Sequence, residues 1–149
     1  MSARKTVGAY SAAQGDVMNT PDGFEMVGRR AFYRPVAVVS FTEAVALVAD
    51  AITYAREVGA SELLVNTTRF TGKYGFEPPN TTERYLVAEK WALATGGRLR
   101  VAVVARQEMI DRRKFGVTVA ANRGAVGDIF RTEAEALTWL DRGGDTKQN

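Results

Sequence analysis

A unit that recurs along the chain constrains its fold more than any other feature: a short apolar run, a capped amphipathic helix, then glycine. Three segments place a helix-capping side chain three positions before a glutamate: Ser40 and Glu43, Asn80 and Glu83, and Thr132 and Glu135. At this spacing the cap side chain accepts a hydrogen bond from the third helical amide, and the glutamate accepts one from the cap's own amide. Each pair therefore predicts the start of a helix.

The helices predicted from these caps cover residues 41–58, 81–95 and 133–141, and a fourth is predicted over 107–122. Three of them run out at glycine, which adopts the left-handed conformation at a helix end at little cost; these glycines are Gly59, Gly96 and Gly97, and Gly143 and Gly144. Between the helices lie short β-branched runs typical of buried strands, at 62–66, 100–104 and 126–130. This alternation predicts a single α/β domain with a mixed, largely parallel sheet and about four α-helices.

The amino-terminal part of the chain is less regular. Residues 1–23 have no sustained period and are expected to form an extended segment, in which residues 10–13 are a candidate edge strand. Residues 24–33 alternate between apolar and polar side chains, as in one half-exposed strand. After Pro35, which cannot donate to a sheet ladder, residues 36–39 form either a short strand or an extended lead into the first helix. The domain proper is expected to cover 24–142, with 143–149 as a frayed polar tail.

The composition excludes several kinds of chemistry. The 149 residues contain no cysteine and no histidine, which excludes disulfides, thiolate metal sites and thiol nucleophiles. The residue at the centre of most zinc hydrolases and Ser-His-Asp triads is also absent. No constellation of Asp, Glu, Lys or Tyr replaces it in the sequence. We therefore expect a non-enzymatic protein without a cofactor or a metal.

Charge and hydropathy limit the kinds of partner and the cellular location that we expect for the protein. The net charge is only +3, and the densest basic cluster, at 112–114, lies beside Glu108 and Asp111 in a pattern typical of a solvated helix face. We therefore expect no nucleic-acid partner. No apolar run approaches the roughly 18 residues that span a bilayer, and no apolar segment follows the basic residues near Met1. These patterns predict no membrane insertion and a cytoplasmic location.

The most specific family-like stretch is at 126–140. There a strand ends on Phe130, a capped turn follows, and the next helix reads Glu135-Ala136-Leu137-Thr138-Trp139-Leu140. Together with the order of the predicted elements over 24–140, this stretch resembles the STAS domain of anti-sigma-factor antagonists and its SpoIIAA-like relatives, which share a fold with CRAL-TRIO lipid-transfer domains. The resemblance implies a STAS/SpoIIAA-like domain with a regulatory protein partner, such as an anti-sigma factor or a kinase.

The loop at 66–80 is the candidate functional segment. It is long for a compact domain, and it follows a central strand at the edge where open α/β sheets bind ligands. The resemblance implies a phosphorylatable hydroxyl in this loop, although the aspartate that precedes it in the family is absent here. Thr71 before Gly72 is its nearest equivalent, and Thr68 is a further one. The candidate partner or ligand residues are Asn66, Thr67, Thr68, Arg69, Phe70, Thr71, Gly72, Lys73 and Tyr74.

Two functions follow as predictions. The first is a non-enzymatic regulatory or binding module that acts on a protein partner through the loop, with a homodimer through the amino-terminal strands as a further expectation. The alternative is a small-molecule or lipid-binding protein with an apolar pocket under the same loop. The loop aromatics Phe70, Tyr74 and Phe76 either contact a partner or fold back onto the core. Trp91 and Trp139 lie on apolar stripes and are expected to pack in the core.

Overall fold

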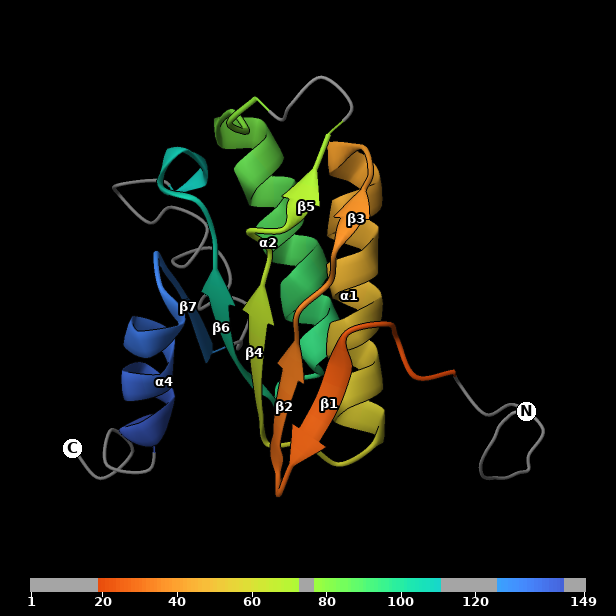
Figure 1. The fold of residues 1–149 in the computed structure, drawn as a ribbon, viewed down its shortest axis with the longest axis vertical. Helices are drawn as coiled ribbons and strands as arrows, with labels where there is room; N and C mark the ends of the chain where they lie inside the picture. Colours follow the sequence, from red (N-terminus) through yellow and green to blue (C-terminus); the bar gives the residue numbers. More distant parts are fainter. Residues whose placement is uncertain (1–18, 73–76, 111–125, 144–149) are drawn as a thin grey trace.

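The structure is a computed structural model that describes residues 19–72, 77–110 and 126–143. These residues form an α/β fold in which helices cover both faces of a sheet (Figure 1). The elements are, in chain order, β1 (Phe24–Val27), β2 (Arg30–Tyr33), β3 (Ala37–Val38), α1 (Phe41–Glu57), β4 (Glu62–Asn66), β5 (Phe70–Thr71), α2 (Thr81–Thr95), β6 (Arg100–Val104), the 3₁₀ turn η1 (Gln107–Met109), β7 (Val126–Phe130) and α4 (Glu133–Asp141).

The main sheet has the strand order β1-β2-β4-β6-β7. Strands β2, β4, β6 and β7 are parallel, and β1 is antiparallel to β2. A separate parallel pair, β3 and β5, lies beyond the carboxyl ends of β2 and β4 (Figure 1). The prediction of a mixed, largely parallel sheet is therefore confirmed, whereas the described residues contain three α-helices rather than about four.

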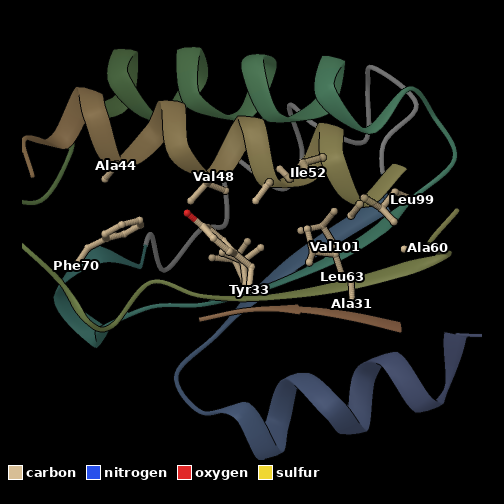
Figure 2. Packing of buried hydrophobic residues seen from close by; sticks show 14 residues of the cluster. Ala31, Tyr33, Ala44, Val48, Ile52, Ala60, Leu63, Phe70, Leu99 and Val101 are labelled. Atoms are coloured by element: carbon tan, nitrogen blue, oxygen red, sulfur yellow. The ribbon is translucent and has the colours of Figure 1, made fainter. Parts of the chain in front are cut away.

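The strands bury both faces of the sheet, because successive side chains point to opposite sides. On β4, Leu63 and Val65 belong to the cluster under α1, whereas Leu64 belongs to the cluster under α4. Figure 2 shows α1 and α2 on one side of the sheet and α4 on the other. The helix of 133–141 that the sequence predicts is thus the described helix that covers the second face.

The prediction of one strand over residues 24–33 is wrong. Gly28 has a φ of +62°, a conformation that glycine adopts readily and other residues rarely do, and the chain reverses there. Residues 24–33 therefore pair with themselves as a hairpin, in which Phe24 lies opposite Tyr33. Residues 10–13, the predicted edge partner, lie outside the described residues, as do the rest of 1–18 and the tail at 144–149. Residues 36–39 contain the short strand β3, which confirms one of the two alternatives.

The helix predicted from residue 107 is also wrong at its start. Residues 107–109 form a single 3₁₀ turn, and Ile110 is extended, with φ −93° and ψ 127°. The physical reason is the missing cap, because the Arg106 side chain makes no capping hydrogen bond and donates instead to the carbonyl oxygens of Thr68 and Phe70. The remainder of this predicted helix, residues 111–122, lies outside the described residues.

The capping predictions are confirmed with one difference. Ser40 and Asn80 both form the complete reciprocal box with the glutamate three positions later. Thr132 accepts a hydrogen bond from the Glu135 amide, but the Glu135 side chain accepts one from the amide of Arg131 instead of Thr132. The predicted left-handed glycines are present at Gly59, Gly96 and Gly97. At Gly143 no positive φ occurs, and the Arg100 guanidinium lies where a Cβ atom would be.

We predict that Ser40→Ala lowers the free energy of unfolding by about 1 kcal/mol, because the Glu43 amide at the start of α1 loses its side-chain acceptor. Urea denaturation followed by circular dichroism measures the change. Thr42→Ala is the matched control, since the exposed Thr42 side chain makes no hydrogen bond within the described residues. Equal destabilisation by both substitutions would contradict the role of the cap.

Candidate functional site

The candidate loop is structured from its first residue. Phe70 and Thr71 form β5, which pairs with Ala37 and Val38 of β3 in parallel register. The loop is described at 66–72 and 77–80, so that Lys73 and Tyr74, and with them Phe76, lie outside the described residues. The first half of the loop is therefore a short sheet extension at the carboxyl ends of β2 and β4.

Asn66 organises the beginning of the loop. Its Oδ1 atom accepts hydrogen bonds from the backbone amide of Thr68 at 2.9 Å and from the Thr68 hydroxyl at 2.6 Å. Its Nδ2 atom donates to Oε2 of Glu133 at 2.8 Å. The Thr67 hydroxyl donates to the carbonyl oxygen of Val104 at 2.9 Å. Both threonine hydroxyls thus act as donors that fix the loop to its own asparagine and to β6.

Glu133 joins this loop to α4. Arg34 donates to it through two nitrogens, from Nε to Oε2 at 2.9 Å and from Nη2 to Oε1 at 3.1 Å. These hydrogen bonds from Arg34, with a further one from Asn66, hold the pKa of Glu133 below its usual range despite partial burial. The same pairing raises the pKa of Arg34. The sequence marks Glu133 only as an acidic residue in the first helical turn, so its reach to the loop was not foreseen.

The remaining loop residues divide into buried and exposed positions. Phe70 is only 2% exposed and belongs to the core cluster under α1, as Figure 2 shows at one end of that cluster near Ala44. Of the two alternatives for this aromatic, the fold-back onto the core is confirmed. Arg69 and Thr71 are exposed, and Gly72 is half-buried. Of the two candidate phosphoacceptors, Thr71 therefore has the accessible side chain and Thr68 has the hydrogen-bonded one.

A cavity of about 180 Å³ lies beside Phe70, between the two helices α1 and α2 and the sheet at β6 and β7. Its described walls are largely apolar. They consist of Phe41, Ala44, Val45, Val48, Ile52, Phe70, Pro79, Val87, Ala88, Trp91, Ala92, Val101, Val103, Ala105, Met109, Val126, Gly127 and Ile129. The polar or charged members of the described wall are Thr67, Thr95, Arg84, Arg106 and Asp128.

The cavity exists because α2 presents small side chains to the interior. Its buried residues are Ala88, Ala92 and Thr95, whereas Leu86 and Leu93 are 56% and 72% exposed. These short inner side chains do not fill the space between α2 and the sheet. The larger Trp91 lines the cavity. Its indole Nε1 donates a hydrogen bond to the carbonyl oxygen of Val45 in α1, at 3.1 Å.

Two arginines of the cavity wall lie at the same end of the sheet. Arg84, at the end of the first turn of α2, donates from Nη1 to the carbonyl oxygen of Met109 at 3.0 Å. Arg106, which follows β6, donates from Nη1 to the carbonyl oxygens of Thr68 and Phe70, both at 3.2 Å. The basic end of the cavity is therefore at the carboxyl ends of β4 and β6, where open α/β sheets bind ligands.

The described residues contain no group of three or more acidic side chains placed to hold a metal ion. Among 19–72, 77–110 and 126–143, no helix has both the length and the apolar character needed to cross a membrane. No family model, curated protein or solved structure matches this chain. The resemblance to STAS domains accordingly stays a prediction from the sequence, and the function has to be argued from the loop and the cavity.

We predict that Glu133→Gln lowers the free energy of unfolding near pH 7 by about 1 kcal/mol or less, because the partly exposed ion pair with Arg34 loses its charge. The pKa of Glu133 is lowered by folding, so its contribution is complete above the pKa of the unfolded state and is lost as the pH falls through the folded pKa. The two proteins should therefore converge in stability at acidic pH.

Urea denaturation at a series of pH values measures this convergence. Glu77→Gln is the control, since the exposed Glu77 forms no ion pair within the described residues. A difference between wild type and Glu133→Gln that stays constant across the acidic range would contradict the assignment.

Proposed function

We propose that the protein binds a small apolar molecule in the cavity between α1, α2 and the sheet. The observation that carries this proposal is the combination of the cavity's volume with its apolar lining. An apolar cavity of roughly 150 Å³ in another protein stays free of water and binds benzene. The cavity here, at about 180 Å³, suits a ring of that size with a few additional atoms.

The size of the cavity favours a ligand site over a simple packing defect. Protein interiors are close-packed, and few voids exceed the size of a water molecule. Among the described residues this space is larger than a water molecule and partly open to solvent, so its apolar wall atoms lack packing partners. An apolar occupant supplies part of the missing packing, and the aromatic and aliphatic walls with a few polar groups are typical of ligand sites.

A second function, the regulatory module predicted from the loop, is favoured by a separate observation. Val36 and Val38 are 73% and 71% exposed, and Val38 pairs in register with the exposed Thr71. Two exposed valines beside an exposed hydroxyl give a protein partner an apolar contact and a modifiable side chain at one place. Both the cavity and the loop surface are proposed as sites of a non-enzymatic, cytoplasmic binding protein. The homodimer and the identity of any partner stay predictions.

Native mass spectrometry of the purified protein, followed by denaturation of the same sample, separates the two proposals. Release of a stoichiometric small molecule supports the cavity as the working site. A protein without any bound molecule, which also fails to bind added apolar probes, contradicts the cavity proposal and leaves the loop surface as the remaining candidate.

We predict that toluene binds the wild-type protein and raises its thermal unfolding midpoint. At roughly ten times the dissociation constant, the gain is about 1.4 kcal/mol. Ala92→Leu should abolish this gain, because Ala92 is buried in the cavity wall and the larger side chain occupies the ligand's space. Calorimetric unfolding with and without toluene measures both effects.

Ala134→Leu is the matched control, since Ala134 is exposed on α4 and lies outside the cavity wall. If Ala92→Leu folds poorly, Ala88→Leu is a second variant that fills the same cavity. A toluene-induced gain that persists in a well-folded filled variant would show that toluene binds elsewhere and would contradict the proposal.

A further inference from the structure

We infer that the molecule held in the cavity carries a carboxylate, which Arg84 and Arg106 bind at the carboxyl ends of β4 and β6. This inference rests on the proposed cavity function and deepens it by naming the chemical class of the ligand. The ligand would be a monocarboxylic acid with an apolar body about the size of one ring. The body occupies the apolar cavity, and the acid group faces the two arginines.

Arg84 has most of its hydrogen-bonding capacity available. A guanidinium has five N–H donors in a planar fork that matches a carboxylate. Within the described residues, Arg84 uses only Nη1, toward the carbonyl oxygen of Met109, and forms no ion pair. Its side chain lines the cavity. A cation in an apolar wall is stabilised when an anion enters the same space.

Arg106 is a fixed second donor. Its Nη1 atom holds the carbonyl oxygens of Thr68 and Phe70, and its Nε atom lies 3.3 Å from Oε2 of Glu108, whose side chain is 60% exposed. Its Nη2 atom forms no hydrogen bond within the described residues. The backbone contacts orient the guanidinium before any ligand arrives, which reduces the ordering cost of binding.

The charges of the cavity wall favour an anion. The acidic residue among its described members is Asp128, which pairs in register with Ala102. Ala102 belongs to the cluster under α4, so strand alternation places the Asp128 side chain toward that opposite face. Among the described residues, therefore, no carboxylate side chain faces the arginines inside the cavity, and the apolar surroundings strengthen their attraction for an incoming one.

The charge balance favours a carboxylate over a phosphate. Arg106 already shares its charge with Glu108, which leaves the charge of Arg84 without an acidic partner in the described part of the chain. A monoanion matches this single uncompensated charge, whereas a dianion would bring excess negative charge into an apolar site.

Binding of benzoate, benzamide, toluene and phenyl phosphate to the wild-type protein, measured by calorimetry, tests the inference. Benzoate and benzamide have nearly the same shape and differ in charge. We expect benzoate to bind on the order of tenfold more tightly than benzamide, since hydrogen bonds to a charged group are stronger than those to a neutral one. Added salt should weaken the binding of benzoate and leave that of toluene unchanged.

Variants of Arg84 test the residue. Arg84→Met should bring the affinities for benzoate and benzamide together while toluene still binds, and Arg84→Lys should restore part of the preference through its charge. Arg98→Met is the matched control, because Arg98 is exposed after the other end of α2 and does not line the cavity. Retained toluene binding by Arg84→Met shows that the cavity is intact.

The outcomes separate this inference from the function on which it rests. Failure of all four probes to bind overturns the cavity function itself. Binding of toluene without a preference for benzoate over benzamide overturns the carboxylate while leaving the cavity function in place. Tighter binding of phenyl phosphate than benzoate, or a benzoate preference that Arg84→Met leaves undiminished, likewise overturns the assignment.

Discussion

The hydrogen bond from the Trp91 indole to the carbonyl oxygen of Val45 ties α2 to α1, and these two helices together cover one face of the sheet (Figure 2). A second contact runs from Nη1 of Arg56, near the end of α1, to the carbonyl oxygen of Ala94, one turn after Trp91 on α2, at 3.1 Å. Apart from Trp91, which packs against the core cluster, the buried positions of α2 carry short side chains, and α1 holds α2 from the side. Small residues such as Ala88 and Ala92 are tolerated there, and the cavity is the consequence.

The opposite face of the sheet is closed in a different way. Glu62 accepts hydrogen bonds from Arg30 at 2.8 Å and from Arg100 at 3.2 Å, so that the amino ends of β2, β4 and β6 share one charged row. The Arg100 guanidinium lies 4.2 Å from the centre of the Trp139 ring and donates to the carbonyl oxygen of Leu140. At the other end of α4, Glu133 pairs with Arg34. Favourable charges thus fix both ends of α4, as expected from the helix dipole.

Local signals made much of the fold predictable. The capping pairs that begin at Ser40 and Asn80, and the β-branched strand runs, depend on neighbours in the sequence, and the structure contains them. The hairpin at Gly28 was missed because its strands also fit one continuous alternation. The helix predicted from residue 107 fails at its start because the Arg106 side chain serves the loop after β4 instead of a cap.

The position of the candidate site in the fold was predictable from the sequence, but the shape of the site was not. The loop after β4 was found because a long connection at the carboxyl end of a central strand can be read from the sequence. The burial of Phe70, the position of Arg84 against Met109 and the volume of the cavity depend on how α2 lies against α1. Those contacts join residues distant in the sequence. A cavity in particular is a space left by several elements, and no motif of residues encodes it.

Phe70 connects the cavity to the surface. Its ring lines the cavity, its backbone belongs to β5 beside the exposed Val38, and its carbonyl oxygen is held by Arg106. A carboxylate bound by Arg106 would therefore contact the same side chain that holds the backbone of β5 through Phe70. The two proposed functions are linked if β5 takes one position when the cavity is occupied and another when it is empty. A ligand shifts the equilibrium between two such positions only by the difference between its affinities for them. Linkage then requires that a partner bound at β3 and β5 changes the affinity for the acid by the same factor.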